Sequence, residues 1–83
     1  MEKGNTVESS RRPLNVLMSY LNNPIRVKLK NNIEYRGKMS QCDNYMNLIL
    51  NEAIEYNEEE PIANYGNILI RGNNILYINV TPV

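Results

Sequence analysis

The chain of 83 residues is long enough for one small domain, and a domain of this size buries only about 60% of the surface that its unfolded form exposes. Nine Lys and Arg balance nine Asp and Glu, which argues against a protein that holds nucleic acid mainly by neutralising phosphates. Histidine is absent and there is one cysteine, so the usual groups for acid–base catalysis, nucleophilic catalysis and metal binding are lacking. The composition therefore predicts a non-enzyme without cofactor or metal, whose small core is stabilised by oligomerisation.

The single cysteine, Cys42, is typical of a reducing compartment, because secreted domains of this size usually carry paired cysteines. No apolar run approaches the roughly 20 residues that a membrane span needs. The first ten residues are polar rather than a signal peptide. We therefore expect a soluble, cytoplasmic protein without a membrane partner, and a flexible tail over residues 1–11, where Val7 is the apolar side chain available for burial.

An amphipathic helix is predicted over about residues 13–22. Pro13 suits the first turn of a helix, where its missing N–H costs nothing. Apolar side chains follow at i, i+3, i+4 and i+7: Leu14, Leu17, Met18 and Leu21. Asn22-Asn23-Pro24 ends the helix, because the residue before a proline is pushed away from helical dihedrals. The apolar stripe is expected to cover the core of the domain.

From Ile25 the apolar period changes to two, which predicts a half-buried strand up to Lys30. Asn31-Asn32 then predicts a tight hairpin turn, because asparagine tolerates positive φ. A second strand follows over residues 33–39. Gly37 in its middle has no side chain to pack, and such a glycine usually marks a bulge or the sharp bend of a small barrel.

A third strand is predicted over Met46–Ile54, and a solvated acidic loop over about residues 56–64, which contains Glu58-Glu59-Glu60. Two more strands, Gly66–Arg71 and Ile75–Val80, complete a set of one helix and five strands. The last two are apolar without alternation, and an apolar edge strand invites pairing with another chain. Repeated with a fixed rotation, such pairing closes a ring. The pattern therefore predicts a ring-forming small β-barrel.

Two motifs carry the functional interpretation. The first is the hairpin around Gly37 followed by Asp43-Asn44-Tyr45-Met46-Asn47, and the second is Ile70-Arg71-Gly72-Asn73-Asn74-Ile75. In this order and at this separation they resemble the Sm and Sm-like (LSm) family, over about residues 13–80. The resemblance implies a mainly β fold, in which an N-terminal helix covers a strongly bent five-stranded antiparallel small barrel of SH3-like or OB-like form. It places an Sm domain at 12–83, with its two motifs at about 25–54 and 65–80.

The resemblance also implies a ring, usually of seven subunits, that binds single-stranded U-rich RNA at its pore. By analogy, Tyr45 and Arg71 stack on the two faces of a base. Asn47 reads the base edge through its amide, and Asp43 orients that amide. Gly72 and Asn73 bring backbone groups close to the base. Because positions 43, 45 and 47 alternate, we expect their side chains to face the pore together from the entrance of a strand.

Taken singly, each of these residues has an ordinary structural explanation, as a turn residue, an exposed aromatic or a surface cation; in one chain and in this order they favour RNA binding. The segment from Arg12 to Lys30 and the short tail after Val80 resemble archaeal members, which form rings of identical subunits. The two motifs also resemble eukaryotic subunits of mixed rings, so other Sm-like chains stay open as partners, as does a ring that serves only as a scaffold for proteins. A bacterial Hfq-type ring lacks the Arg-Gly-Asn pattern of the second motif, and no DNA binding is expected.

Overall fold

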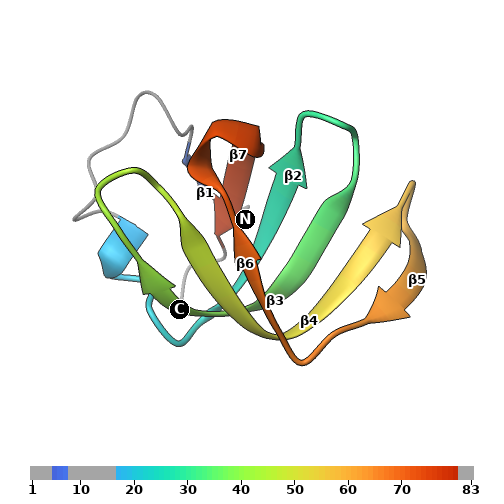
Figure 1. Ribbon diagram of the computed structural model, residues 1–83, viewed down its shortest axis with the longest axis horizontal. Helices are drawn as coiled ribbons and strands as arrows, with labels where there is room; N and C mark the ends of the chain where they lie inside the picture. The colour runs from blue at the N-terminus through green and yellow to red at the C-terminus, as the bar shows by residue number, and fades with distance from the viewer. Residues whose placement is uncertain (1–4, 8–16, 81–83) are drawn as a thin grey trace.

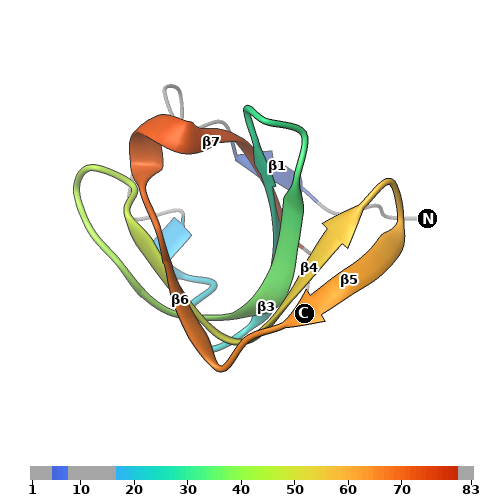
Figure 2. The same cartoon turned by 45° about the vertical axis from the view of Figure 1, so that its right-hand side comes forward.

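The computed structural model describes residues 5–7 and 17–80 (Figure 1). Their strands form one strongly bent antiparallel sheet in the order β1-β7-β2-β3-β4-β5, with β6 paired to β4 as well (Figure 2). The elements are β1 (Asn5–Val7), β2 (Pro24–Leu29), β3 (Glu34–Cys42), β4 (Leu48–Asn57), β5 (Glu60–Asn64), β6 (Asn67–Ile70), the short 3-10 helix η1 (Gly72–Asn74) and β7 (Ile75–Val80). The predicted mainly β antiparallel fold is confirmed.

The predicted helix is described only at its end, because residues 13–16 lie outside the described residues. Leu17 and Met18 are helical and turns follow up to Asn22, whose φ of 68° stops the helix before Pro24. Leu17 is fully buried and Leu21 packs against the core, whereas Met18 is 45% exposed. Within the described part, Leu17 and Leu21 therefore cover the core as expected, and Met18 does not.

The core lies inside the bend of the sheet and is filled mainly by inward-facing side chains of β2, β3, β4, β6 and β7, together with Leu17 and Met46. It consists of Leu17, Ile25, Val27, Met39, Met46, Leu48, Leu50, Ala53, Ile70, Ile75, Ile78 and Val80. Among the described residues no polar or charged side chain is buried. No described helix is long and apolar enough to cross a membrane.

Gly37 marks the bend of the sheet, as its place in the strand predicted. The pairing of β3 with β4 shifts register between Arg36 and Lys38, and on β4 the extra residue Glu52 takes a φ of 53°. A Cβ at Gly37 would lie 2.8 Å from the Asn51 carbonyl oxygen. The bulge and the missing side chain together let β4 fold closely over β3.

The predicted turn at Asn31-Asn32 is present, with Asn32 at a φ of 76°, in a connection of four residues between β2 and β3. The predicted fourth strand is longer than expected. It consists of β5 and β6, which are separated by Tyr65 and Gly66 and both pair with β4. Counted this way, the five predicted strands are all present.

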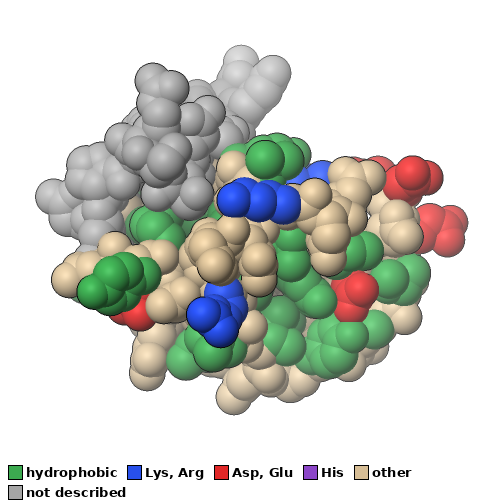
Figure 3. Space-filling view, turned by 45° about the horizontal axis from the view of Figure 1, so that its top comes forward, with side chains coloured by type: hydrophobic (Ala, Val, Ile, Leu, Met, Phe, Trp, Pro, Cys, Tyr) green, Lys and Arg blue, Asp and Glu red, His purple; other side chains and the backbone are tan. Residues whose placement is uncertain are grey.

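The acidic loop predicted over residues 56–64 is wrong in its extent. β4 continues to Asn57 and β5 begins at Glu60, so that only Glu58 and Glu59 form the turn. Both have positive φ, which is the geometry of a tight hairpin turn. The pairing of β4 with β5 therefore outweighs the low strand propensity of glutamate. Acidic side chains gather at the end of the molecule that this hairpin forms (Figure 3).

The predicted flexible tail over residues 1–11 also needs correction. Asn5–Val7 form β1, which pairs antiparallel with the last three residues of β7, from Ile78 to Val80. The physical reason is that β7 offers unpaired backbone groups on the side away from β2. The other residues of the predicted tail lie outside the described part of the chain.

Candidate RNA-binding site

Strand pairing brings the two sequence motifs together. Asp43–Asn47 connect β3 with β4, and Arg71–Asn74 connect β6 with β7. β4 and β6 are neighbours in the sheet, and their register sets Leu48 opposite Ile70. The residues next to this pair, Asn47 and Arg71, therefore lie side by side although they are far apart in the sequence.

Asp43 organises the first connection as the centre of a tight turn. Its Oδ1 accepts hydrogen bonds from the backbone N–H groups of Tyr45 at 2.9 Å and Asn47 at 3.0 Å, and its carbonyl accepts from the Met46 N–H at 2.9 Å. The predicted strand entrance at Met46 is therefore wrong. Met46 has a φ of 65°, and β4 begins at Leu48 because the Asp43 side chain offers the backbone a better set of partners than a strand would.

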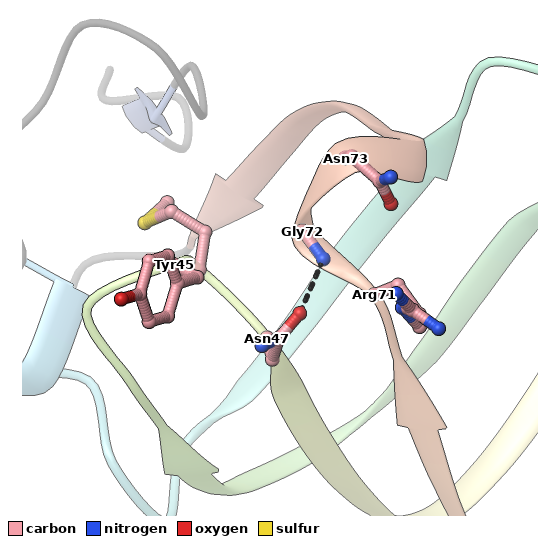
Figure 4. Close-up of a pocket in the computed structure, with 6 residues that line it drawn as sticks. Tyr45, Asn47, Arg71, Gly72 and Asn73 are labelled. Atoms are coloured by element: carbon pink, nitrogen blue, oxygen red, sulfur yellow. Dashed lines mark hydrogen bonds between the residues drawn. The ribbon is translucent and has the colours of Figure 1, made fainter.

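The Asn47 side chain is held at both ends. Its Nδ2 donates to Asp43 Oδ2 at 3.0 Å, and its Oδ1 accepts from the Gly72 N–H at 2.8 Å. A carboxylate only accepts and a backbone N–H only donates, so the two contacts fix which end of the amide is oxygen. Figure 4 shows the bond to Gly72 at the floor of the site.

Gly72 is buried where the two connections touch. A Cβ at this position would overlap the Tyr45 carbonyl oxygen and lie 3.0 Å from the Met46 carbonyl carbon. Only glycine therefore allows the close approach that brings its N–H to Asn47.

An open cavity of about 460 Å³ lies between the two connections. It is lined by Tyr45, Met46, Asn47, Arg71, Gly72 and Asn73. Tyr45 and Arg71 lie on opposite sides of Asn47 (Figure 4), and Tyr45 is 79% exposed. Neither side chain makes a hydrogen bond or ion pair within the described part of the chain. Two flat groups thus flank a fixed amide, which is an arrangement that can hold a planar ring.

Five of the six predicted site residues line this cavity, and the sixth, Asp43, lies behind it on Asn47. Met46 also lines the cavity and was not predicted. Its apolar side chain and the expected strand made it a core residue only, and its positive φ gives no signal in the sequence. Among the described residues, no group of three or more His, Cys, Asp or Glu could hold a metal ion.

The pKa of Asp43 lies below its ordinary value of 3.8, because the Asn47 side chain and the backbone N–H groups of Asn47 and Tyr45 all donate to the carboxylate. A carboxyl whose folded pKa is lowered stabilises the fold at a pH above its unfolded pKa, and this contribution is lost as the pH falls through the folded pKa. We therefore expect the turn to stay ordered through about pH 4 and to open only below it.

Asp43 is the only aspartate in the chain, so its carboxyl carbon is assigned without ambiguity in an NMR pH titration. The amide resonances of Tyr45 and Asn47 should move at the same low pH as that carbon. In Asp43→Asn these amide transitions should disappear. A midpoint at or above the ordinary aspartate pKa would contradict the hydrogen-bonded turn.

Comparison with known proteins agrees with the fold. Residues 15–80 match the LSM domain family. An snRNP Sm-like protein of Methanosarcina barkeri is 39% identical over 84% of this chain and 97% of its own length. The U6 snRNA-associated Sm-like protein LSm6 of Debaryomyces hansenii is 40% identical over 76% of this chain and 74% of its own length.

Solved structures give the same result. The Sm protein of Pyrococcus abyssi in complex with a uridine heptamer superposes with a TM-score of 0.81, at 37% identity, over 86% of this chain and all of that one. A heptameric archaeal Sm protein superposes with a TM-score of 0.75, at 29% identity, over 82% of this chain and 98% of that one.

Fold, site and relatives define an RNA-binding protein of the Sm-like class. The chain belongs to the LSM domain family, whose members bind RNA and are not enzymes. The resemblance drawn from the two sequence motifs is thereby confirmed, as is the expectation that the protein has no catalytic activity.

Proposed function

We propose that this protein binds single-stranded, uridine-rich RNA at the pore of a ring of seven identical subunits and acts in RNA processing or ribonucleoprotein assembly. The observation that carries the proposal is the fixed Asn47 amide. Its oxygen accepts one hydrogen bond and its nitrogen donates one, so one acceptor site and one N–H remain for a ligand.

The remaining pair of groups suits uracil. Uracil offers a donor at N3–H next to an acceptor at O4, which meets the free oxygen lone pair and the free N–H of Asn47 in the right order. Cytosine offers the opposite order, an acceptor at N3 and a donor at N4. Because Asp43 and Gly72 prevent the amide from flipping, cytosine would face like groups on both contacts.

Stacking supplies the sequence-independent part of the binding. Tyr45 and Arg71 flank Asn47, and a stacked base contributes about 1–3 kcal/mol by alanine substitution. One such site is weak. Several equal sites on one ring hold a single RNA strand much more tightly, because each later contact is intramolecular.

Exposed apolar side chains on the last two strands support the ring. Among the strands that the structure describes, β6 pairs with β4 alone, and its Leu69 is 65% exposed. Leu76 of β7 is 51% exposed. Ile78–Val80 of β7 pair with β1 on this edge, so a neighbour's β6 would meet the first half of β7, Ile75–Tyr77. Pairing there would bury both leucines and satisfy the open backbone edge of β6. The similarity to a heptameric archaeal Sm protein and to one crystallised with a uridine heptamer supports seven subunits and uridine as the base.

Combined replacement of Tyr45 and Arg71 by alanine tests the site. We expect the affinity for oligo-U, measured by fluorescence anisotropy, to fall by at least about 100-fold, since stacking is lost at every occupied site. Tyr45→Phe is the matched control, because it keeps the ring and the tyrosine hydroxyl has no hydrogen bond within the described part of the chain.

The unmodified protein should bind oligo-U well and oligo-C poorly. If the double variant binds oligo-U as tightly as the unmodified protein, the proposed stacking by Tyr45 and Arg71 is contradicted. Equal binding of both oligonucleotides would contradict the role of Asn47, and binding of neither would favour a scaffold for protein partners.

A ring that mixes different Sm-like chains is the second candidate. It is favoured by the 40% identity to a U6 snRNA-associated LSm6 protein. Native mass spectrometry of the purified chain separates the two, because a chain made for a mixed ring should not form a homoheptamer. We further propose a cytoplasmic location, since a lone, half-buried Cys42 fits a reducing compartment.

A further inference from the structure

A basic surface lies on the outward face of the sheet, away from the base-binding cavity. In β2, Ile25 and Val27 are buried, so the alternation turns Arg26 and Lys28 outward. Lys38 of β3 lies opposite Pro24 and is also exposed. None of the three cations lines the cavity between Tyr45 and Arg71. We call Arg26, Lys28 and Lys38 the outer basic face.

The charges of this surface are only partly balanced. Arg36, the fourth outward cation, is bound by Glu34 at 2.6 Å and Glu59 at 2.9 Å and lies 3.7 Å from the centre of the Tyr56 ring. Glu34 faces Lys28 across the strands, but its carboxylate is already held by Arg36. Within the described residues, the outer basic face has no ion pair of its own.

One strand pairing places Arg26 beside a cation that is already neutralised. The register sets Arg26 of β2 directly opposite Arg36 of β3. Because Glu34 and Glu59 are both held by Arg36, the charge of Arg26 stays available to an external anion.

The neighbours on β7 suit a phosphate backbone. Asn79 lies opposite Arg26 and Tyr77 opposite Lys28, both half-buried on the same face. Amide and hydroxyl groups are common donors to phosphate oxygens and sugars, beside Arg and Lys. Glu34 and Glu59 reach this face, but both are held by Arg36, and other acidic side chains gather at the hairpin turn around Glu58. A chain of zero net charge therefore presents one face suited to a polyanion.

We propose that the outer basic face binds phosphates of the RNA that extends beyond the bases held in the cavity. The cavity and the outer basic face contribute differently to RNA binding. The cavity discriminates bases and depends little on salt, whereas the outer basic face is indifferent to sequence and depends steeply on salt. The protein thereby holds long RNA more tightly than a uridine heptamer.

The test compares two RNAs with a variant that lacks part of the face. The variant is Arg26→Gln with Lys38→Gln, and both positions are exposed on strands, so the fold should tolerate the change. The probes are a labelled uridine heptamer and the same heptamer with a mixed-sequence tail, about 30 nucleotides long. Anisotropy is measured at several salt concentrations.

We expect the variant to bind the heptamer within about twofold of the unmodified protein and the tailed RNA at least about fivefold more weakly at low salt. The salt slope for the tailed RNA should fall by about 0.7 for each phosphate that the variant no longer neutralises, or about 1.4 per subunit for two phosphates. Arg26→Lys with Lys38→Arg keeps the charge and should keep the binding of both RNAs.

Two outcomes would overturn the proposal: unchanged binding of the tailed RNA, or an equal loss for both RNAs. The result is separate from the fate of the cavity. If the unmodified protein ignores the heptamer but binds the tailed RNA with a steep salt slope that the variant loses, the function of the cavity fails and the outer basic face stands.

Discussion

Gly72→Ala is expected to abolish binding of oligo-U and to destabilise the fold. The new methyl group would overlap the Tyr45 carbonyl oxygen and press on the Met46 carbonyl carbon at 3.0 Å, and these are backbone atoms that cannot rotate away. Overpacking of this kind usually costs about 1–3 kcal/mol. Relief requires the two connections to separate, and separation breaks the hydrogen bond from the Gly72 N–H to Asn47.

Gly66→Ala is the matched control, because a Cβ at Gly66 meets no atom within 4 Å and its φ is not positive. Thermal unfolding and oligo-U anisotropy of the two variants should therefore differ, with only Gly72→Ala impaired. A Gly72→Ala protein with normal uridine affinity would show that the close approach of the two connections is not needed for binding.

Asn47→Asp should remove the uridine preference and weaken binding at neutral pH by at least about tenfold. The new carboxylate can still accept from the Gly72 N–H, but its second oxygen would lie where Nδ2 now donates to Asp43 at 3.0 Å. Two carboxylates so close repel, and neither offers the N–H that uracil O4 needs. The turn at Asp43 should therefore loosen as base reading is lost.

Exchanging the two residues, as Asp43→Asn with Asn47→Asp, separates the two effects. The exchange restores one amide beside one carboxylate, so the stability of the turn should recover in thermal unfolding. The affinity for uridine should stay low, because position 47 still lacks a donor. Recovery of oligo-U binding in the exchanged protein would show that Asn47 acts through the turn and not on the base.

The regular parts of the fold could be predicted because each follows from a local pattern. Ile75–Val80 matches β7 residue for residue, and Gly37 marks the bulge as expected. The conformation of Asp43–Asn47 could not be predicted, because the alternating residue types are compatible with both a strand and a turn. The segment forms a turn because three groups donate to the Asp43 carboxylate and Met46 has a positive φ. Neither feature is visible in the hydrophobic periodicity of the sequence.

The remaining errors came from pairing between distant segments. The charge run at Glu58–Glu60 predicts a solvated loop. In the structure β4 lies beside this segment, and the backbone pairing of β4 with β5 extends to Asn57 and Glu60. The pairing of Asn5–Val7 with β7 depends likewise on a free edge that only the folded sheet creates. The residues of the candidate site, in contrast, were predicted from the family motifs alone, and the structure adds which of their atoms meet.

The register that sets Leu48 opposite Ile70 also protects the site from error. A slip of one residue between β4 and β6 would turn Leu48 and Leu50 out of the core and would move Asn47 away from Gly72 at the same time. The register that buries the two leucines is therefore also the register that forms the cavity. A molecule that has buried these leucines has therefore already placed Asn47 beside Gly72 in the candidate site.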